Sequence, residues 1–422
     1  MSFRAKQQCE LVSIVATSRN LRLLPRLVCH AFLAATLGSV FLLLPQVQAS
    51  AQTESGPQKI SEVRRNFPLD KFYDVPTPLP AGKPGDLIRS EEFDDYDLPP
   101  GVVAIRILYH SRSANGDDVA VSGVVLYPDK QAPRTGWPVI AWAHALNGVA
   151  RQCAPSLARN LQHGPYLSMY VSLGYGVVAT DYAGLGTVSR SAFSDAQSNA
   201  TDVIDSIPAA RAAVPQLDSH WVAVGVGEAG PVVARVAELE TEMRGPGYLG
   251  SILISGLDDP RDQYQSSGSG NLQTPLFLAY GIQTIYPQFN PKDVLTDKGL
   301  SLFPEVEKSC VDPARKSPSE ILKANWMSNT FVKQYFARNA AGQRPAQRPM
   351  LIISSALDPS IPIGRTAQTV FKMCKEGDEI QFERYPQSEI STLFGDSVGD
   401  QISWIQARFA NRPAADNCSA KP

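Results

Sequence analysis

The sequence predicts an α/β fold in which helices cover both faces of a mostly parallel sheet, with a helical cap inserted between two strands. Two alternating apolar runs, joined through Asn115-Gly116-Asp117, indicate a hairpin early in the chain. Short apolar runs then alternate with helical patterns, as they do in parallel sheets. Between about residues 258 and 345 this order breaks and prolines become frequent, which favours an insertion.

Each element follows from its apolar spacing. Alternation predicts the hairpin strands, short apolar runs bounded by turns predict buried strands, and apolar residues three or four apart predict helices. The predicted strands are 102–109, 119–127, 139–143, 175–180, 220–226, 251–255, 350–354 and 379–385. The predicted helices are 166–172, 200–214, one that begins at Pro231, 319–324, 331–338, 366–375 and one near the end of the chain that contains Ile402, Trp404 and Ile405.

The chain divides into five predicted parts. Residues 1–51 form a signal peptide or N-terminal anchor, 52–86 an extended segment, 87–257 the first part of the core, 258–345 the cap and 346–422 the second part of the core. The leader has a positively charged start, an apolar run over 27–44 and small residues suited to cleavage near 47–51. These features favour a secreted or periplasmic protein. The apolar run also reaches the length of a membrane span, so an uncleaved leader is the only membrane contact expected.

Charge and cysteine content exclude several classes of protein. Without the leader the chain carries 34 basic and 40 acidic residues, with no basic block, so a nucleic-acid partner is not expected. Neither Cys-x-x-Cys nor His-x-x-x-His spacing occurs, so we expect no metal, and we expect no cofactor. After the leader an even number of cysteines remains, which predicts two disulfides with three pairings open. These cysteines are Cys153, Cys310, Cys374 and Cys418.

One stretch, 220–230, has the pattern of a nucleophile elbow. An apolar strand enters a tight turn flanked by Gly225 and Ala229, and a helix follows from Pro231. In the Gly-x-Ser-x-Gly form of this motif a serine is held on a strained backbone at the top of the sheet. Gly227 stands at the serine position here. Because glycine accepts positive φ freely, we expect this substitution to relieve strain and remove the nucleophile.

The same stretch also spells Gly-x-Gly-x-x-Gly, the fingerprint of a dinucleotide site. That site needs an early βαβ unit and an acidic residue about 20 positions on, at the end of the next strand. Here the turn lies past the middle of the chain, and Asp258 follows the next strand too late. The pattern therefore disfavours nucleotide binding.

Further motifs resemble the secretory lipase family of the α/β-hydrolase superfamily. Besides the elbow, the matching stretches are 141–148, 153–156, 181–186, 356–362 and 385–390. The resemblance implies the α/β-hydrolase fold, and a reaction in which serine attacks an ester, histidine takes its proton and aspartate orients the histidine. It places the acid at Asp358, the serine at Gly227 and the histidine at Ile390.

The resemblance implies two further features. Asn147 and the backbone N–H of Glu228 match the groups that hold the oxyanion. The cysteines are expected to pair as Cys153 with Cys310 and Cys374 with Cys418.

Histidine positions support a degenerate triad independently of the resemblance. This fold places its base after the acid in the chain, in the order Ser, Asp, His. The five histidines are His30, His110, His144, His163 and His220, and none follows Asp358.

Other residues that would restore chemistry have simpler interpretations. Ser397 lies in a Gly-x-Ser-x-Gly sequence but has no histidine after it, and we predict that it caps a helix. We expect Glu228 to be a polar residue at a helix start and His144 to be a hydrogen-bonded structural histidine. Asp358 is expected to tie its own loop.

The sequence therefore predicts an exported secretory-lipase-like protein that is catalytically inactive. One alternative is an active esterase or lipase that cleaves acyl esters with a non-standard nucleophile. Another is an interaction module, or a module that binds an apolar or ester small molecule beneath the cap.

Overall fold

The computed structural model describes residues 66–243, 247–266, 274–314 and 320–418. The predicted leader, 1–51, and the first part of the extended segment lie outside these ranges. By its internal contacts the chain from Glu62 to Pro422 forms one compact unit, and the description below concerns that unit.

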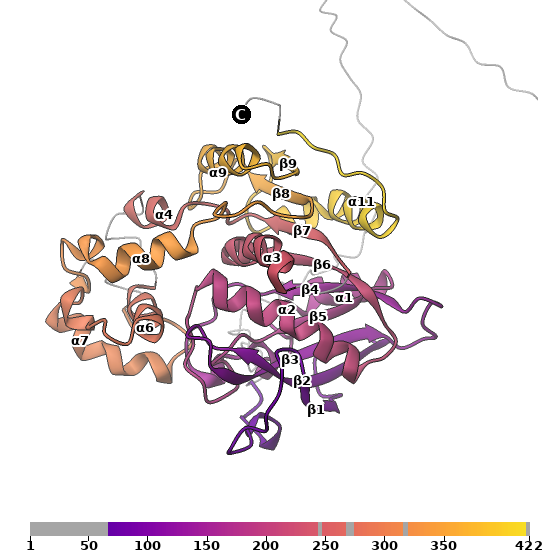
Figure 1. Cartoon of the computed structure of the whole chain (residues 1–422), viewed down its shortest axis with the longest axis horizontal. Helices are drawn as coiled ribbons and strands as arrows, with labels where there is room; N and C mark the ends of the chain where they lie inside the picture. The colour runs from indigo at the N-terminus through magenta and orange to yellow at the C-terminus, as the bar shows by residue number, and fades with distance from the viewer. Residues whose placement is uncertain (1–65, 244–246, 267–273, 315–319, 419–422) are drawn as a thin grey trace, which may run out of the picture. The chain divides into compact units, whose positions relative to one another are not determined.

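A nine-stranded sheet organises the protein (Figure 1). Its strand order is β1-β2-β3-β5-β4-β6-β7-β8-β9. Antiparallel pairs join β1 to β2, β2 to β3 and β3 to β5, and the remaining neighbours are parallel. The strands are β1 Leu87–Glu92, β2 Val102–Arg112, β3 Asp118–Pro128, β4 Trp137–Ala143, β5 Gly176–Thr180, β6 Leu217–Val226, β7 Tyr248–Ile254, β8 Met350–Ser355 and β9 Ile380–Tyr385.

Eight of these strands confirm predicted ones to within a few residues, but β1 was not predicted. Its sequence is Leu-Ile-Arg-Ser-Glu-Glu, and its residues range from half-buried to exposed. A strand at the edge of the sheet needs no buried alternating face, so its sequence carries little periodicity.

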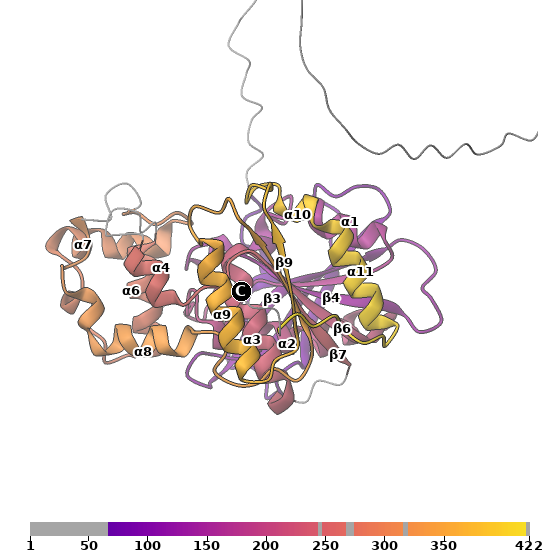
Figure 2. The ribbon, with the colours of Figure 1, turned by 90° about the horizontal axis from the view of Figure 1, so that it is seen from above.

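Helices cover both faces of the sheet (Figure 2). One face packs against α2 Ala196–Ala213, α3 Gly230–Met243 and α9 Ile363–Lys375, and the other against α1 Gly164–Ser172, α10 Leu393–Asp396 and α11 Val398–Phe409. Successive residues of β6 pack on opposite faces of the sheet. Trp221 packs on the face covered by α2, α3 and α9, and Val222 packs on the face covered by α1, α10 and α11. This alternation follows from the two-residue period of a strand. The predicted α/β fold with both faces covered is confirmed.

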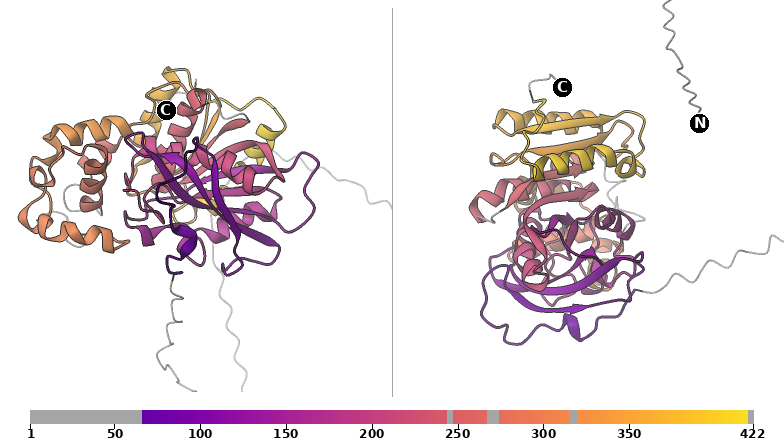
Figure 3. Two further views of the ribbon diagram at one scale, coloured as in Figure 1. Left: turned by 60° about the horizontal axis from the view of Figure 1, so that its bottom comes forward. Right: turned by 90° about the vertical axis from the view of Figure 1, so that its right-hand side faces the viewer.

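Between β7 and β8 the chain forms a separate group of helices, called the cap below (Figures 1 and 3). Its members are α4 Pro260–Ser266, α6 Pro275–Ile285, α7 Asp297–Leu302, α8 Thr330–Asn339 and the 3₁₀ turns η5 Pro291–Asp293, η6 Phe303–Lys308 and η8 Trp326–Ser328. The cap residues Phe277, Trp326, Tyr335 and Phe336 belong to one apolar cluster that also includes Ala192 and Phe193 of the core.

The cap confirms one predicted helix and contradicts another. Helix α8 confirms the helix predicted over 331–338. The helix predicted over 319–324 is wrong in the part that the structure describes. There Leu322 forms an isolated antiparallel bridge with Leu295, and Ile321 and Leu322 are both buried. Adjacent apolar residues that both pack inward satisfy a short bridge as well as a helix turn, and the sequence pattern did not distinguish the two.

Two disulfides connect distant parts of the chain. Cys153 is bonded to Cys310, and Cys374 to Cys418, which is the pairing that the family resemblance implied. Further 3₁₀ turns are η1 Lys71–Tyr73, η2 Arg151–Cys153, η3 Pro155–Leu157 and η4 Gly227–Ala229. Within the described ranges, no helix is both long and apolar enough to cross a bilayer.

Candidate catalytic site

The turn after β6 has the backbone of a nucleophile elbow. Strand β6 ends at Val226, η4 follows, and α3 begins at Gly230. Gly227 has φ of +60°, and a Cβ placed on it would meet no atom within 4 Å. A side chain at this position would therefore project into open space, on a backbone that L-residues adopt only under strain. The predicted turn is present, and the helix begins one residue before Pro231.

Unlike Gly227, the neighbouring glycines have no room for a side chain. A Cβ on Gly225 would lie 2.9 Å from the Ala229 carbonyl oxygen, and one on Gly230 would lie 2.9 Å from the Gly256 carbonyl oxygen. A Cβ on Gly256, which follows β7, would lie 1.7 Å from the Gly227 carbonyl oxygen. These glycines allow β6, α3 and the chain after β7 to approach more closely than side chains permit. The structure thus preserves the close packing that an elbow requires.

Asp358, at the expected acid position, lies in the loop after β8 and is buried. Its Oδ1 accepts hydrogen bonds from the backbone N–H groups of Ser360 at 2.8 Å and Ile361 at 3.0 Å. Its Oδ2 accepts a hydrogen bond from the Ser255 hydroxyl at 2.9 Å. The contacts expected of a residue that ties its own loop are therefore present, and they link this loop to the end of β7.

Ile390, at the expected histidine position, follows β9 and is 47% exposed. The Ser355 hydroxyl at the end of β8 donates a 2.5 Å hydrogen bond to the Ser388 carbonyl, which holds this loop against the neighbouring strand. Strands β6 to β9 are parallel, so the loops with Gly227, Asp358 and Ile390 emerge at one edge of the sheet. Of the three positions at which the resemblance predicts a Ser-Asp-His triad, only Asp358 has a side chain of the required kind.

Asn147 and Glu228 differ in their freedom to contact an oxyanion. The Asn147 side-chain amide donates a hydrogen bond to the Cys153 carbonyl, so it is engaged in holding its own loop. Glu228 lies in η4 directly before α3 and is exposed, as expected of a polar residue at a helix start. Both residues line a pocket whose other lining residues also belong to the core.

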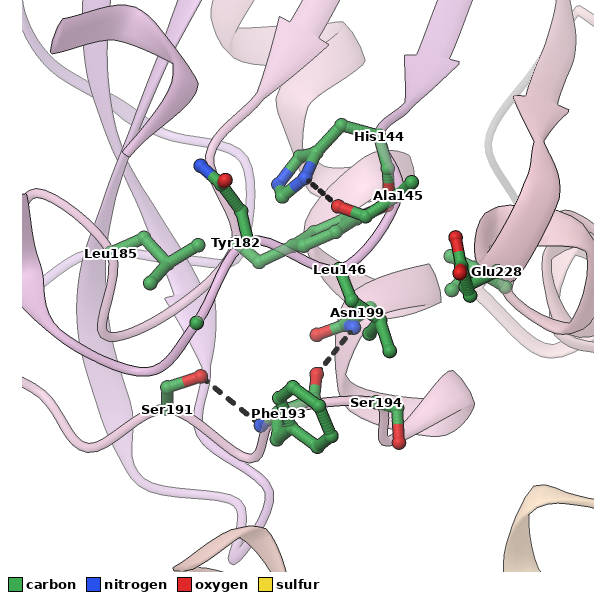
Figure 4. A pocket seen from close by; sticks show the side chains of 13 residues that line it. His144, Ala145, Leu146, Tyr182, Leu185, Ser191, Phe193, Ser194, Asn199 and Glu228 are labelled. Atoms are coloured by element: carbon green, nitrogen blue, oxygen red, sulfur yellow. Dashed lines mark hydrogen bonds between the residues drawn. The ribbon is translucent and has the colours of Figure 1, made fainter. Parts of the chain in front are cut away.

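This pocket is small. It offers about 10 Å³ of space for water centres, which is enough for roughly one water molecule. Besides Asn147 and Glu228 it is lined by His144, Ala145, Leu146, Gly148, Tyr182, Leu185, Ser191, Phe193, Ser194, Asn199 and Val232. Figure 4 shows Tyr182, Ser191, Phe193 and Ser194 facing it from the chain between β5 and α2.

Sequence reasoning missed the contribution of residues 182–194. The stretch 181–186 was among the matching motifs, but its spacing gave no reason to place it at the pocket. In the structure it follows β5, whose carboxyl end lies at the same edge as that of β4 and β6. Strand order would have revealed this, and strand order is not visible in the sequence.

His144 is the structural histidine that we expected. Its Nδ1 lies 2.6 Å from the Ala145 carbonyl oxygen and its Nε2 lies 3.1 Å from the Asp181 carbonyl oxygen, and the ring stacks on Tyr182 (Figure 4). Burial lowers the pKa of His144 to about 4, although both carbonyl contacts favour the charged ring. At neutral pH the ring is therefore uncharged and carries one N–H, so it donates to one carbonyl at a time.

The hydroxyls near the pocket have other partners. Ser191 Oγ accepts a hydrogen bond from the Phe193 backbone N–H at 3.1 Å, and Ser194 Oγ lies 3.0 Å from the Tyr335 hydroxyl. The Tyr182 hydroxyl donates to the His144 backbone carbonyl at 3.1 Å. Among the described residues no hydroxyl at the pocket is hydrogen-bonded to a histidine ring. A Ser219–His220 contact of 3.5 Å lies in the amino-terminal half of β6, at the opposite end from the elbow.

Ser397 is buried between α10 and α11 and takes the N-cap position of α11, as predicted. Its hydroxyl does not cap that helix, however. It donates to the Leu393 carbonyl at 2.6 Å and accepts from the Gln401 side-chain amide at 2.8 Å. The residue therefore joins two helices, and no histidine is among its partners.

The part of the chain that the structure describes contains neither a free thiol nor a group of side chains suited to a metal ion. Each cysteine there is half of a disulfide. No group of three His, Cys, Asp or Glu side chains in these ranges could hold a metal ion.

Comparison with known proteins confirms the resemblance. The model of the secretory lipase family matches residues 298–417, a range that includes Asp358 and Ile390 but not the elbow. The protein named "Probable inactive lipase MT1628" of Mycobacterium tuberculosis (strain CDC 1551 / Oshkosh) is 22% identical over 389 residues, covering 82% of this chain and 83% of that protein.

Solved structures show the same fold. Candida antarctica lipase A in its closed state matches with a TM-score of 0.69 and 17% identity, over 85% of this chain and 90% of that chain. The rice cell wall degrading esterase LipA from Xanthomonas oryzae matches with a TM-score of 0.64 and 19% identity, over 78% of this chain and 98% of that chain. The fold of this chain is that of the α/β-hydrolase lipases and esterases.

Proposed function

We propose that this secretory-lipase-like α/β-hydrolase is an exported protein that does not cleave esters, because its nucleophile and its base are both absent. One observation carries the proposal. The elbow backbone is intact, but the position that presents the nucleophile is Gly227, with only open space where a hydroxyl would stand. Without that hydroxyl no acyl-enzyme forms.

The loss of the base supports the same conclusion. The last histidine of the chain is His220, and Ile390 occupies the loop after β9 where the fold places its imidazole. Removing the nucleophile of a triad costs about as much as removing the whole triad, roughly 10⁶ in kcat, so either substitution would suffice. The name of the similar M. tuberculosis protein agrees with this proposal.

Export is supported by three features together. The leader at 1–51 has the pattern of a signal peptide, the family matched is that of secretory lipases, and the chain has two disulfides. Structural disulfides persist outside the reducing cytosol, so both suggest an extracellular or periplasmic protein.

Hydrolysis of short-chain p-nitrophenyl esters tests the proposed inactivity. We expect the purified wild-type protein and Gly227→Ala, which removes no functional group, both to hydrolyse these esters no faster than buffer alone. Incubation with a fluorophosphonate probe should give no labelled serine. Turnover well above the rate in buffer, or labelling at any serine, would instead support the alternative of an active esterase with a non-standard nucleophile.

A ligand-binding role would require the pocket to widen. The described pocket holds roughly one water molecule, whereas sites for small molecules enclose several hundred Å³. What holds the loops of its wall in place therefore decides whether this site accepts any ligand.

A further inference from the structure

The cap is attached to the core at the pocket itself, and the first attachment is at the loop after β4. Cys153 in this loop is bonded to Cys310 of the cap. Gly148 approaches the same cap segment, since a Cβ placed on it would lie 3.1 Å from the Cys310 Cα. The Gln152 side chain donates a 3.3 Å hydrogen bond to the Glu307 carbonyl. The disulfide is thus centred on a contact between the cap and the loop that carries Asn147.

The second attachment involves the chain between β5 and α2. Phe193 lies 5.6 Å, ring to ring, from Phe277 of α6. Gly281 of α6 packs on this segment closely enough that a Cβ would lie 2.8 Å from the Ala192 carbonyl oxygen. Ser194 contacts the Tyr335 hydroxyl of α8 at 3.0 Å. Arg190 of the same segment lies 4.3 Å from the ring centre of Tyr280 and donates hydrogen bonds to Gln283 and Thr284 of α6. All these contacts are non-covalent, so they can break and re-form.

The third attachment lies at the carboxyl end of the cap. Arg338 of α8 forms hydrogen bonds of 2.7 and 3.0 Å with the buried Asp195 carboxylate at the start of α2. Arg235 of α3 donates to the Arg338 and Ala340 carbonyls at 3.0 and 3.1 Å. This attachment fixes the point where the cap returns to the core.

The disulfide differs from the other attachments in kind. Within the described ranges Cys153–Cys310 is the one covalent cross-link between cap and core besides the backbone itself, and it joins residues 157 positions apart. Gly148 and Asn147, which lie beside it, also line the pocket. Of the two residues that form the disulfide, Cys310 is exposed and Cys153 is buried.

We propose that the Cys153–Cys310 disulfide is a redox-sensitive latch that holds the cap against the loop after β4, and that its reduction frees this loop, which forms one wall of the pocket. A thiolate of a dithiol attacks the Cys310 sulfur, and Cys153 leaves as a thiolate that takes a proton. The second thiolate of the dithiol then resolves the mixed disulfide and releases Cys310, which is also protonated. Two electrons pass to the protein, and the dithiol becomes a disulfide.

The second disulfide provides a matched control. Cys374, in α9, and Cys418 lie in the carboxyl-terminal part of the core and are both half-buried. Reduction of this bond removes one cross-link from the chain without releasing the cap. A general loss of stability would follow from removing either disulfide, whereas a local opening of the cap should follow only from removing the latch.

Hydrogen–deuterium exchange of the full chain, followed by mass spectrometry of its peptides, tests the latch. We expect peptides from 146–153 and 275–312 to exchange about tenfold faster or more in Cys153→Ser/Cys310→Ser than in the wild type. The Cys374→Ser/Cys418→Ser variant should leave the same peptides unchanged. Equal effects of the two variants, or no effect of the first, would overturn the proposal.

Reduction of the folded wild type keeps the test decisive if the serine variant does not fold. After graded exposure to dithiothreitol, free thiols are alkylated and located, and exchange is measured on the same samples. Alkylation of Cys153 and Cys310 with faster exchange in 275–312 supports the latch. Alkylation without a change in exchange, or only together with Cys374 and Cys418 on global unfolding, contradicts it.

This readout is independent of turnover. The latch concerns the pocket of the proposed function but does not rest on the loss of chemistry. Ester cleavage by the reduced wild type would contradict the proposed inactivity and leave the latch supported.

Discussion

The glycines around the turn after β6 have two different roles. Gly227 is bordered by open space, so its lack of a side chain removes a functional group without being required by packing. Gly225, Gly230 and Gly256 are bordered by backbone atoms at distances that a Cβ would violate. The site therefore retains the residues that an elbow needs structurally and lacks the one that it needs chemically.

Gly256→Ala should be severely destabilising. Its Cβ would fall 1.7 Å from the Gly227 carbonyl oxygen, on a backbone with φ of +83°, so the chain after β7 would have to move away from the elbow. We expect the free energy of unfolding, measured in urea with disulfides intact, to fall by about 3 kcal/mol or more.

Gly399→Ala is the matched control for that substitution. Gly399 lies in α11, and a Cβ there would meet no atom within 4 Å. The free energy of unfolding should rise by up to about 1 kcal/mol, because alanine restricts the unfolded chain and favours the helix. Similar losses in both variants would contradict the close packing inferred at Gly256.

Residue positions could be predicted from the sequence better than side-chain partners. The turn at Gly227 and the loop contacts of Asp358 are where the pattern placed them, because an elbow and a loop carboxylate have strong local signals. The engagement of Asn147 with the Cys153 carbonyl was not foreseen, and neither was the backward hydrogen bond of Ser397. Both depend on which of several nearby groups a side chain meets once the chain is folded.

Helix α2 carries a pair of buried carboxyls against β2. The Ser111 hydroxyl lies 2.6 Å from Asp202 Oδ1 and 2.9 Å from Asp205 Oδ2, and it has a single proton to donate. Burial raises the pKa of Asp202 to about 8 and that of Asp205 to about 7. Hydrogen bonds from Ser111 and, for Asp202, from the Ala183 backbone N–H lower both pKa values, but by less than burial raises them.

Stability should therefore fall as pH rises across the neutral range. A carboxyl with a raised folded-state pKa binds its proton more tightly when the chain is folded than when it is unfolded, where its pKa is about 4. The contribution to the free energy of unfolding is thus fully present below about pH 4 and is lost as pH rises through 7 and 8.

Urea unfolding at pH 4.5, 6 and 8 measures this dependence. Asparagine cannot ionise, so Asp205→Asn should make the decline of the free energy of unfolding with pH shallower. Asp129→Asn, at an exposed position directly after β3, should leave that decline unchanged. A decline between pH 6 and 8 that is equally steep in the wild type and in Asp205→Asn would contradict the assignment of raised pKa values to α2.

Elements with strong periodicity were predictable, and weakly amphipathic ones were not. Strands buried on both faces, such as β4 and β8, read as apolar runs in the sequence. Strand β1 and helices α4, α6 and α7 were missed, because an edge strand and short helices between prolines have no sustained period. The helix predicted over 319–324 failed for a related reason, since a six-residue pattern fits a bridge as well.

At the scale of the whole molecule, the relation of cap to core decides what the site can do. The pocket wall is made by the loop after β4, the chain between β5 and α2 and the start of α3, and the first two of these contact the cap directly. Such contacts join residues more than 80 positions apart, and no local pattern encodes them. The disulfide pairing was expected only from the family resemblance, because spacing alone left three pairings open.

Restoring both missing side chains tests the central claim most directly. The rate of hydrolysis of a short-chain p-nitrophenyl ester is measured for the wild type, Gly227→Ser, Ile390→His and the double variant. We predict that only the double variant exceeds the Gly227→Ala background, by about 10²-fold or more, because the hydroxyl and the imidazole act as a unit with Asp358. Ester cleavage by the wild type, equal activity in Gly227→Ser alone, or a folded double variant without activity would contradict the account.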